Sequence, residues 1–342
     1  MSDFITGLRG DLMQAAARAE ARPVRQRVAV AWRPALAFAA VAIAVVAVAD
    51  LLHSVVPRER PASTRVAEVL HLGGLPADAV FAHGGLWVLD ERGGLRRVTG
   101  EPVHVDTPAA ASALVSGPRE LWAIGQNGRQ GYWLLGADGD TGRRTFFKNY
   151  PGVLMGLADG ETGLWFSDTR PAFANRLDGR RIRLPETSYI AAGGGTIWAL
   201  DDIHGSLSAV DERTGKVALR LHALVDPTGS PGSGGHLMAA DATGVWIADP
   251  GRDHVVRVTR QGIQRSVAVG PLPGPIAVRG STLWASTGDP HGHAFQLKRV
   301  DLRTGEVSDG IPVGAHPPRV LVPLAGGCWV VAADGTAMRI TG

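Results

Sequence analysis

Seven residues in the second half of the chain belong to types that bind ligands or transfer protons. Imidazole nitrogens and carboxylates coordinate divalent metal ions such as zinc, and the same groups serve as general acid and general base. An arginine beside them adds a permanent positive charge. The segments that carry these residues are rich in Gly, Pro and Asp, which is typical of loops. The candidate binding residues are His236, Asp249, Asp289, His291, His293, His316 and Arg319.

The same residues have a simpler interpretation. Asp249 and Asp289 each precede a proline and His291 precedes a glycine, and such dipeptides are common in turns. The alternative is therefore that these are solvated turn residues without a ligand. We assign them no metal ion, no cofactor and no catalytic role. Cys328 is the only cysteine of the chain, which excludes an intramolecular disulfide and a metal cluster built on cysteines.

A motif centred on Trp recurs seven times and predicts the elements that must position these residues. Its Trp returns every 33 to 48 residues, with Gly-rich turns between the copies. A repeat of about 40 residues made of short apolar runs and turns is typical of β-propeller blades. Seven copies therefore predict seven blades. The copies are GGLWVLD (84–90), RELWAIG (119–125), TGLWFSD (162–168), GTIWALD (195–201), TGVWIAD (243–249), STLWAST (281–287) and GGCWVVA (326–332).

Each copy can be divided into the four strands of one blade. An apolar strand such as YIAAG (189–193) leads through a Gly turn to the Trp strand, and a polar loop leads to a third strand such as SLSAV (206–210). A hairpin of the form Asp-x-x-Thr-Gly, as in DERTG (211–215), leads to the fourth strand. We expect the large, flat Trp ring to pack between neighbouring blades.

The last copy is one strand short. It ends at MRITG (338–342) after three strands, and the apolar stretch RVAEVLHL (65–72) precedes the first blade. We expect residues 65–72 to pair beside residues 335–340, because this pairing closes the ring and removes a free sheet edge.

The Trp motif and the Asp-x-x-Thr-Gly turn resemble those of seven-bladed propellers of the YVTN, NHL and streptogramin-lyase-like type. The resemblance covers residues 65–342 and implies an all-β, seven-bladed β-propeller. It implies little about function, because this fold carries many functions. Quinoprotein dehydrogenase repeats place a Trp just after the same turn, and TGKVALR (214–220) and TGEVSDG (304–310) have none, which argues against a quinone cofactor. The lyase members use His and Glu on their loops, and no stretch of this chain matches that set.

The two faces of the predicted ring differ in their loops. The loop that enters each blade and the loop between its second and third strands lie on one face, which we call the loop face. The other turns lie on the opposite face, the hairpin face. Loop-face segments are long and varied, as in DPTGSPGSGGH (226–236), whereas hairpin-face turns are short and similar. Because variable loops on a rigid scaffold carry function, we expect a ligand on the loop face, near the seven candidate residues of blades 5 to 7.

Residues 34–52 are apolar apart from Asp50 and predict a transmembrane anchor. Eighteen helical residues span roughly 27 Å, close to the thickness of a bilayer core. A buried helix and a cleaved signal peptide are the alternatives, because AVA (47–49) fits a cleavage site. The long segment before the anchor favours an uncleaved, single-pass span. Five arginines precede the anchor closely and three follow it, which predicts a cytoplasmic N-terminus and a propeller outside the cell membrane.

Residues 1–33 predict an amphipathic cytoplasmic helix, with Phe4, Ile5 and Leu8 near one face. Such a helix lies on the inner membrane surface or docks a cytoplasmic partner. Membrane anti-sigma factors share this layout, but their zinc-binding form carries a His and Cys cluster that residues 1–33 lack. Residues 53–64 are mostly polar and contain two prolines, which predicts a short tether.

The composition bears on the class of partner. The formal net charge of the chain is only +3, and nucleic-acid binding needs a concentrated basic face, so we expect no nucleic-acid partner. We expect a membrane-anchored, extracytoplasmic propeller that acts as a binding or protein-interaction module for an unknown protein or small molecule. The alternatives are a streptogramin-lyase-like lyase or hydrolase that uses the loop histidines, and a transmembrane signalling protein with a propeller sensor domain.

Overall fold

The computed structural model describes residues 64–342, and within this range it leaves out positions 109, 129–130, 170–171, 185–188, 202, 227–235, 290 and 292. The predicted cytoplasmic helix (1–33), the predicted anchor (34–52) and almost all of the predicted tether (53–64) lie outside the described residues. Within the part that is described, no helix has the length and apolar character needed to cross a bilayer.

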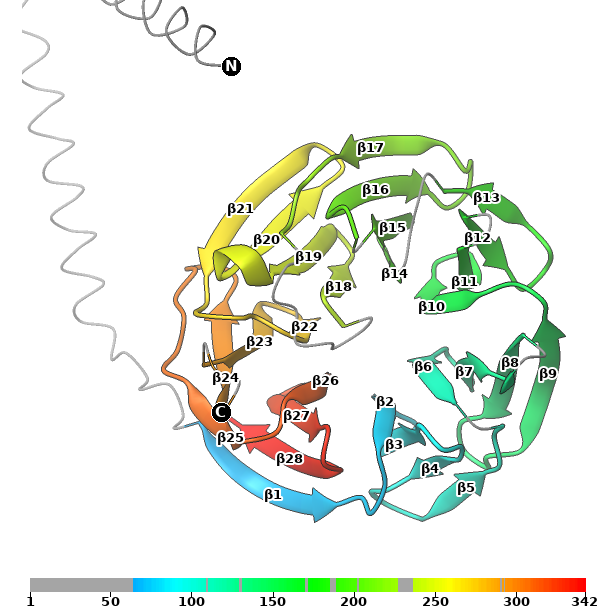
Figure 1. Cartoon of the computed structure of the whole chain (residues 1–342), viewed down its shortest axis with the longest axis horizontal. Helices are drawn as coiled ribbons and strands as arrows, with labels where there is room; N and C mark the ends of the chain where they lie inside the picture. Colours follow the sequence, from blue (N-terminus) through cyan, green and yellow to red (C-terminus); the bar gives the residue numbers. More distant parts are fainter. Residues whose placement is uncertain are drawn as a thin grey trace, which may run out of the picture. The chain divides into compact units, whose positions relative to one another are not determined.

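The described strands form seven antiparallel sheets of four strands each, arranged as a ring of blades (Figure 1). The predicted all-β, seven-bladed propeller is therefore confirmed. From the innermost strand to the outermost, blade 1 consists of β2 (Pro76–Ala82), β3 (Gly85–Asp90), β4 (Leu95–Arg97) and β5 (Val103–Val105). Blade 2 consists of β6 (Ala111–Ser116), β7 (Glu120–Gln126), β8 (Tyr132–Asp138) and β9 (Arg144–Tyr150). Blade 3 consists of β10 (Leu154–Gly160), β11 (Gly163–Thr169), β12 (Ala172–Arg176) and β13 (Arg181–Arg183).

The remaining blades follow the same order. Blade 4 consists of β14 (Tyr189–Gly193), β15 (Thr196–Asp201), β16 (Ser206–Asp211) and β17 (Val217–Leu221). Blade 5 consists of β18 (Met238–Asp241), β19 (Gly244–Asp249), β20 (His254–Thr259) and β21 (Gly262–Ala268), with the short 3-10 helix η2 (Pro250–Arg252) after β19. Blade 6 consists of β22 (Ile276–Arg279), β23 (Thr282–Gly288), β24 (Phe295–Asp301) and β25 (Ile311–Gly314). Blade 7 consists of β26 (Pro318–Leu324), β27 (Gly327–Ala332), β28 (Thr336–Thr341) and β1 (Arg65–His71).

Blade 7 joins the two ends of the propeller. Strand β1 pairs antiparallel with β28, so that Arg65 lies opposite Thr341 and His71 lies opposite Thr336. The pairing expected for residues 65–72 is therefore present. It covers an edge of β28 that would otherwise expose unpaired backbone groups.

Each Trp of the repeated motif packs against the next blade. Trp87 of blade 1 belongs to a buried cluster with Leu121 of blade 2, and Trp329 of blade 7 belongs to one with Leu86 of blade 1. The same arrangement holds for the other five interfaces. All seven Trp residues are buried. The predicted packing of Trp between blades is confirmed.

Five of the seven Trp residues lie opposite an arginine on the neighbouring strand of the same blade. The arginines are Arg97, Arg176, Arg257, Arg299 and Arg339. Three of them place the guanidinium over the Trp ring, with distances of 5.4 to 5.8 Å from its centroid. These cation–π contacts stabilise the Trp strand, and they account for part of the arginine content.

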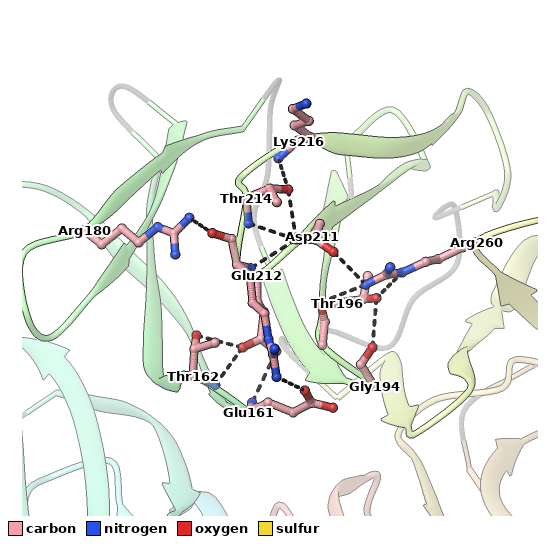
Figure 2. A network of polar contacts seen from close by, with 12 residues as sticks. Glu161, Thr162, Arg180, Gly194, Thr196, Asp211, Glu212, Thr214, Lys216 and Arg260 are labelled. Carbon is pink, nitrogen blue, oxygen red and sulfur yellow. Dashed lines mark hydrogen bonds and ion pairs between the residues drawn. The ribbon is translucent and has the colours of Figure 1, made fainter.

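A polar network ties blades 3, 4 and 5 together on the hairpin face (Figure 2). Asp211 accepts hydrogen bonds from the N–H groups of Arg213 and Thr214 and thereby holds the β16–β17 hairpin, as expected for the Asp-x-x-Thr-Gly turn. Arg260 of blade 5 lies 3.3 Å from the Asp211 carboxylate. Its guanidinium also donates to the backbone oxygen of Gly195.

Glu212 is the buried centre of this network. It is fully inaccessible to solvent. Its carboxylate accepts hydrogen bonds from the backbone N–H of Glu161 at 3.3 Å and from the N–H and hydroxyl of Thr162 at 3.0 and 2.9 Å (Figure 2). The side chain of Glu212, which belongs to blade 4, therefore holds the β10–β11 turn of blade 3.

The variant Glu212→Ala is expected to lower the free energy of unfolding by about 2–3 kcal/mol. The reason is that it leaves buried N–H groups of the β10–β11 turn without an acceptor. Urea denaturation followed by Trp fluorescence measures the loss. Glu161→Ala is the matched control, because its side chain is 51% exposed and lies 3.8 Å from Arg213, so that we expect a loss under about 0.5 kcal/mol. Equal losses in the two variants would contradict the role given to Glu212.

Candidate functional site

A cavity of about 840 Å³ lies at the centre of the ring, where the innermost strands of blades 1 to 5 form most of its wall and Arg319 of blade 7 completes it. We call it the axial cavity. Small residues form much of its wall and leave room near the axis of the ring. A cavity of this volume is sufficient for a small organic molecule or a peptide side chain. The small wall residues are Ala77, Ala111, Ser112, Ala113, Gly156, Ala158, Ala191 and Ala192.

The axial cavity extends from one face of the propeller toward the other. Glu91, in the β3–β4 loop, and Arg319, at the start of β26, mark its end at the loop face. Asp159, next to the β10–β11 turn, marks its end toward the hairpin face. The two ends therefore have different chemical groups.

An ion pair crosses the ring at the axial cavity. Asp78 belongs to β2 of blade 1, and His236 precedes β18 of blade 5. Nε2 of His236 lies 3.1 Å from Oδ1 of Asp78. Blades 1 and 5 are not neighbours, because blades 2 to 4 separate them on one side and blades 6 and 7 on the other. The pair therefore joins opposite sides of the cavity wall.

Both partners are held in place by the backbone. The Asp78 carboxylate accepts hydrogen bonds from the N–H of Ala79 at 2.6 Å and from the N–H of Leu114, in blade 2, at 2.7 Å. The backbone oxygen of His236 accepts a hydrogen bond from Ile276 at the start of blade 6. Asp78 is almost fully buried, whereas the His236 side chain is 26% exposed.

The surroundings of His236 change its proton affinity. Burial alone would lower the pKa of His236, but the negative charge of Asp78 and its hydrogen bond outweigh burial, so that the pKa lies above the ordinary value of 6.5. Within the described part of the chain, Nδ1 of His236 has no hydrogen-bonding partner. The imidazole is therefore fixed by one nitrogen and can offer the other to a ligand.

A second ion pair lies at the loop-face end of the axial cavity. The guanidinium of Arg319, in blade 7, binds the carboxylate of Glu91, in blade 1. Both side chains are about one third exposed. Arg319 is thus a cavity residue, but its charge is already balanced by a neighbouring blade.

Asp159 presents a carboxylate without a cation at the other end of the axial cavity. Among the described residues it forms no ion pair. Burial and, to a smaller extent, the negative charge of Glu212 raise the pKa of Asp159 above its ordinary value of 3.8. A cationic group placed beside Asp159 would favour its ionised form and lower its pKa again.

The other five candidate residues from the sequence lie outside the walls of the axial cavity. Asp249 is buried and holds η2, because it accepts hydrogen bonds from the N–H of Asp226 and from the guanidinium of Arg252. Asp289 accepts hydrogen bonds from the N–H groups of His291 and His293, which form a turn.

The two remaining histidine groups have contacts of their own. The rings of His291 and His293 stack with their centroids 6.3 Å apart. His316 is 61% exposed and lies 3.9 Å from Asp334. Over the described residues, no three or more His, Cys, Asp or Glu side chains are grouped as a metal site. The structure therefore brings His236 and Arg319 to one cavity but does not gather the histidines there.

Sequence reasoning missed Asp78, Glu91 and Asp159. Asp78 lies within the strand PADAVFA and Asp159 within LMGLADG, where an acidic residue on an innermost strand is the available signal. A carboxylate in an apolar strand needs a buried partner, which is a reason to expect a site there.

The chain is similar to known proteins in its fold and not in its sequence. No protein-family profile and no curated protein sequence matches the chain. Virginiamycin B lyase from Staphylococcus aureus superposes with a TM-score of 0.64 at 16% identity, over 82% of this chain and 100% of that one. A chain of a mitotic checkpoint complex gives 0.64 at 10% identity, over 84% and 94%. BamB from Moraxella catarrhalis gives 0.53 at 12% identity, over 78% and 85%.

The Asp78–His236 pair predicts a pH-dependent contribution to stability. The pKa of His236 is raised in the folded state, so the pair contributes fully below the unfolded value of 6.5 and loses its contribution as pH rises through the raised pKa. We therefore expect His236→Gln to lower the melting temperature more at about pH 5.5 than at about pH 8.5. His316→Gln is the control and should show little loss at either pH. A loss for His236→Gln that is the same at both values, or larger at the higher one, would contradict this prediction.

Proposed function

We propose that this chain is a membrane-anchored, extracytoplasmic propeller that acts as a binding module, with the axial cavity as its ligand site. The observation that supports this most is the Asp78–His236 ion pair, which joins blades 1 and 5 at the wall of the cavity. Both partners are held by backbone hydrogen bonds to other blades. A polar group fixed in this way is ready to bind a ligand without reorganisation.

The charges of the axial cavity favour a ligand with a cationic group. Glu91 is paired with Arg319, and Asp78 is paired with His236, whereas Asp159 has no cationic partner among the described residues. An ammonium or guanidinium group beside Asp159 would restore its ordinary tendency to ionise. A small amine, or a Lys or Arg side chain of a protein partner, fits this requirement.

Matched ligands test the proposed cavity site. We expect linear diamines and short Lys-containing peptides to raise the melting temperature of the full-length protein in detergent. Their acetylated forms, which lack the charge, should have no effect. Asp159→Asn should abolish the shift, because it removes the carboxylate and keeps the size of the side chain.

Asp309→Asn is the control for this experiment, because Asp309 is exposed and lies on blade 6 away from the cavity. It should respond to the amines like the wild type. Equal shifts with charged and acetylated ligands, or a shift that survives Asp159→Asn, would refute the proposed site.

The membrane topology is a separate part of the proposal. It is supported by the apolar segment 34–52 and by the excess of arginines before it. Protease added to intact spheroplasts is expected to degrade the propeller, because the propeller would lie outside. An N-terminal epitope tag should stay protected until the membrane is permeabilised. A propeller that survives until permeabilisation would have the opposite orientation.

Acid–base catalysis at His236 is the alternative function. One observation favours it, namely that the buried carboxylate of Asp78 orients the imidazole and raises its pKa. A ligand found by the amine screen can be incubated with the protein and analysed by mass spectrometry. Chemical conversion that is lost in His236→Gln would favour the catalytic alternative, whereas recovery of the unchanged ligand would favour the binding module.

A further inference from the structure

The outermost strands of blades 2, 3 and 4 carry only positive charges. Strands β9 (RTFFKNY), β13 (RIR) and β17 (VALRL) contain five cationic residues and no Asp or Glu. All five are exposed. We call this surface the basic rim, and its residues are Arg144, Lys148, Arg181, Arg183 and Arg220.

The charges of the basic rim are not balanced within the propeller. Among the described residues, none of the five forms an ion pair with a carboxylate. The outermost strands of the other blades differ. Strands β5 and β25 contain no Lys or Arg, and on β1 Glu68 lies 3.9 Å from Arg339. Strand β21 of blade 5 carries one cation, Arg265, which is half-buried and donates a hydrogen bond to the backbone oxygen of Leu302 at 2.9 Å. The basic rim is therefore a local feature of three adjacent blades.

Aromatic and amide side chains hold several of these cations in place. The guanidinium of Arg181 lies 4.1 Å from the ring centroid of Phe173, and its Nε donates a hydrogen bond to Asn175 at 3.0 Å. Nζ of Lys148 lies 4.9 Å from the ring centroid of Tyr150. These contacts restrict long side chains and leave their remaining N–H donors free, so that less conformational entropy is lost when an anion binds.

We infer that the basic rim binds a linear, flexible polymer that carries phosphate groups. Four of its five cations are arginines, and the planar guanidinium fits two oxygens of a phosphate. The anions must repeat along the ligand, because the cations are distributed over three blades.

The shape of the rim favours a flexible polymer over a lipid surface. Strands β9, β13 and β17 follow one another along the outer circumference of the ring, which is convex (Figure 1). A flat membrane touches a convex wall over only part of its length, whereas a flexible chain bends around it.

The strength of binding should depend on salt in a defined way. Each neutralised phosphate of a flexible polyanion releases about 0.7 counterion, so five contacts predict that log K falls with log[salt] with a slope of about −3.5. Because the net charge of the whole chain is only +3, a slope of this size points to local contacts at the basic rim.

Fluorescence polarisation with labelled inorganic polyphosphate, measured on the full-length protein at several NaCl concentrations, tests the inference. We expect Arg181→Gln/Arg183→Gln to weaken binding by at least about 10-fold at low salt and to reduce the slope by about 1.4. Arg279→Gln/Arg303→Gln is the matched control, because both arginines are exposed and lie in blade 6, outside the basic rim. Circular dichroism and melting temperature establish that both double variants remain folded.

Two competitors separate the polymer from other anionic surfaces. Duplex DNA is stiff over about 150 base pairs, and phosphatidylglycerol vesicles offer a nearly flat phosphate surface. We expect unlabelled polyphosphate to displace the probe at lower phosphate concentrations than either competitor. The inference is overturned if polyphosphate does not bind, if the control variant loses as much affinity as the rim variant, or if vesicles or duplex DNA compete as well as polyphosphate.

Discussion

The insertion of one Trp from each blade into the next is the contact on which this propeller depends. A Trp ring is large enough to fill the space between two twisted sheets, and each buried ring contacts both blades. Because every interface uses the same contact, the blades turn by similar steps, and the ring closes when β1 pairs with β28. The innermost strands then surround the axis, and their small side chains leave the axial cavity open. Neither the cavity nor the rim would exist without this spacing.

Polar side chains add hydrogen bonds between blades to the apolar packing of the Trp rings. Trp rings hold the blades through their faces, but the turns at both ends of each strand carry backbone groups that need partners. Glu212 supplies acceptors to the β10–β11 turn of blade 3 on the hairpin face. At the cavity wall, the Asp78 carboxylate accepts a hydrogen bond from the backbone N–H of Leu114 in blade 2. It also forms an ion pair with His236 of blade 5. A carboxylate that already satisfies two buried N–H groups is firmly positioned, which is why its partner imidazole is positioned too.

The sequence predicts the fold better than the site because the two depend on different information. The Trp spacing and the short final blade are local signals, and they predict the number of blades and the closing pair correctly. The Asp78–His236 contact joins residues on opposite sides of the ring, and neither residue has a neighbour in sequence that indicates the other. Strand parity assigns the loop histidines to one face, but it gives no distance around the ring. Asp249 illustrates the consequence, because a carboxylate at a strand end serves the backbone of η2 rather than a ligand.

The axial cavity and the basic rim use opposite ends of the same blades. In each sheet the innermost strand borders the axis and the outermost strand lies at the circumference, with two well-packed strands between them. Side chains can therefore change on either edge without disturbing the Trp contacts, which lie on the second strand.

Acidic groups at the axis and basic groups at the rim also favour different ligands. An anionic polymer is repelled from a cavity that contains Asp159, and a cationic ligand is repelled from Arg181 and Arg183. One rigid ring can thus offer two binding surfaces of opposite charge that do not compete.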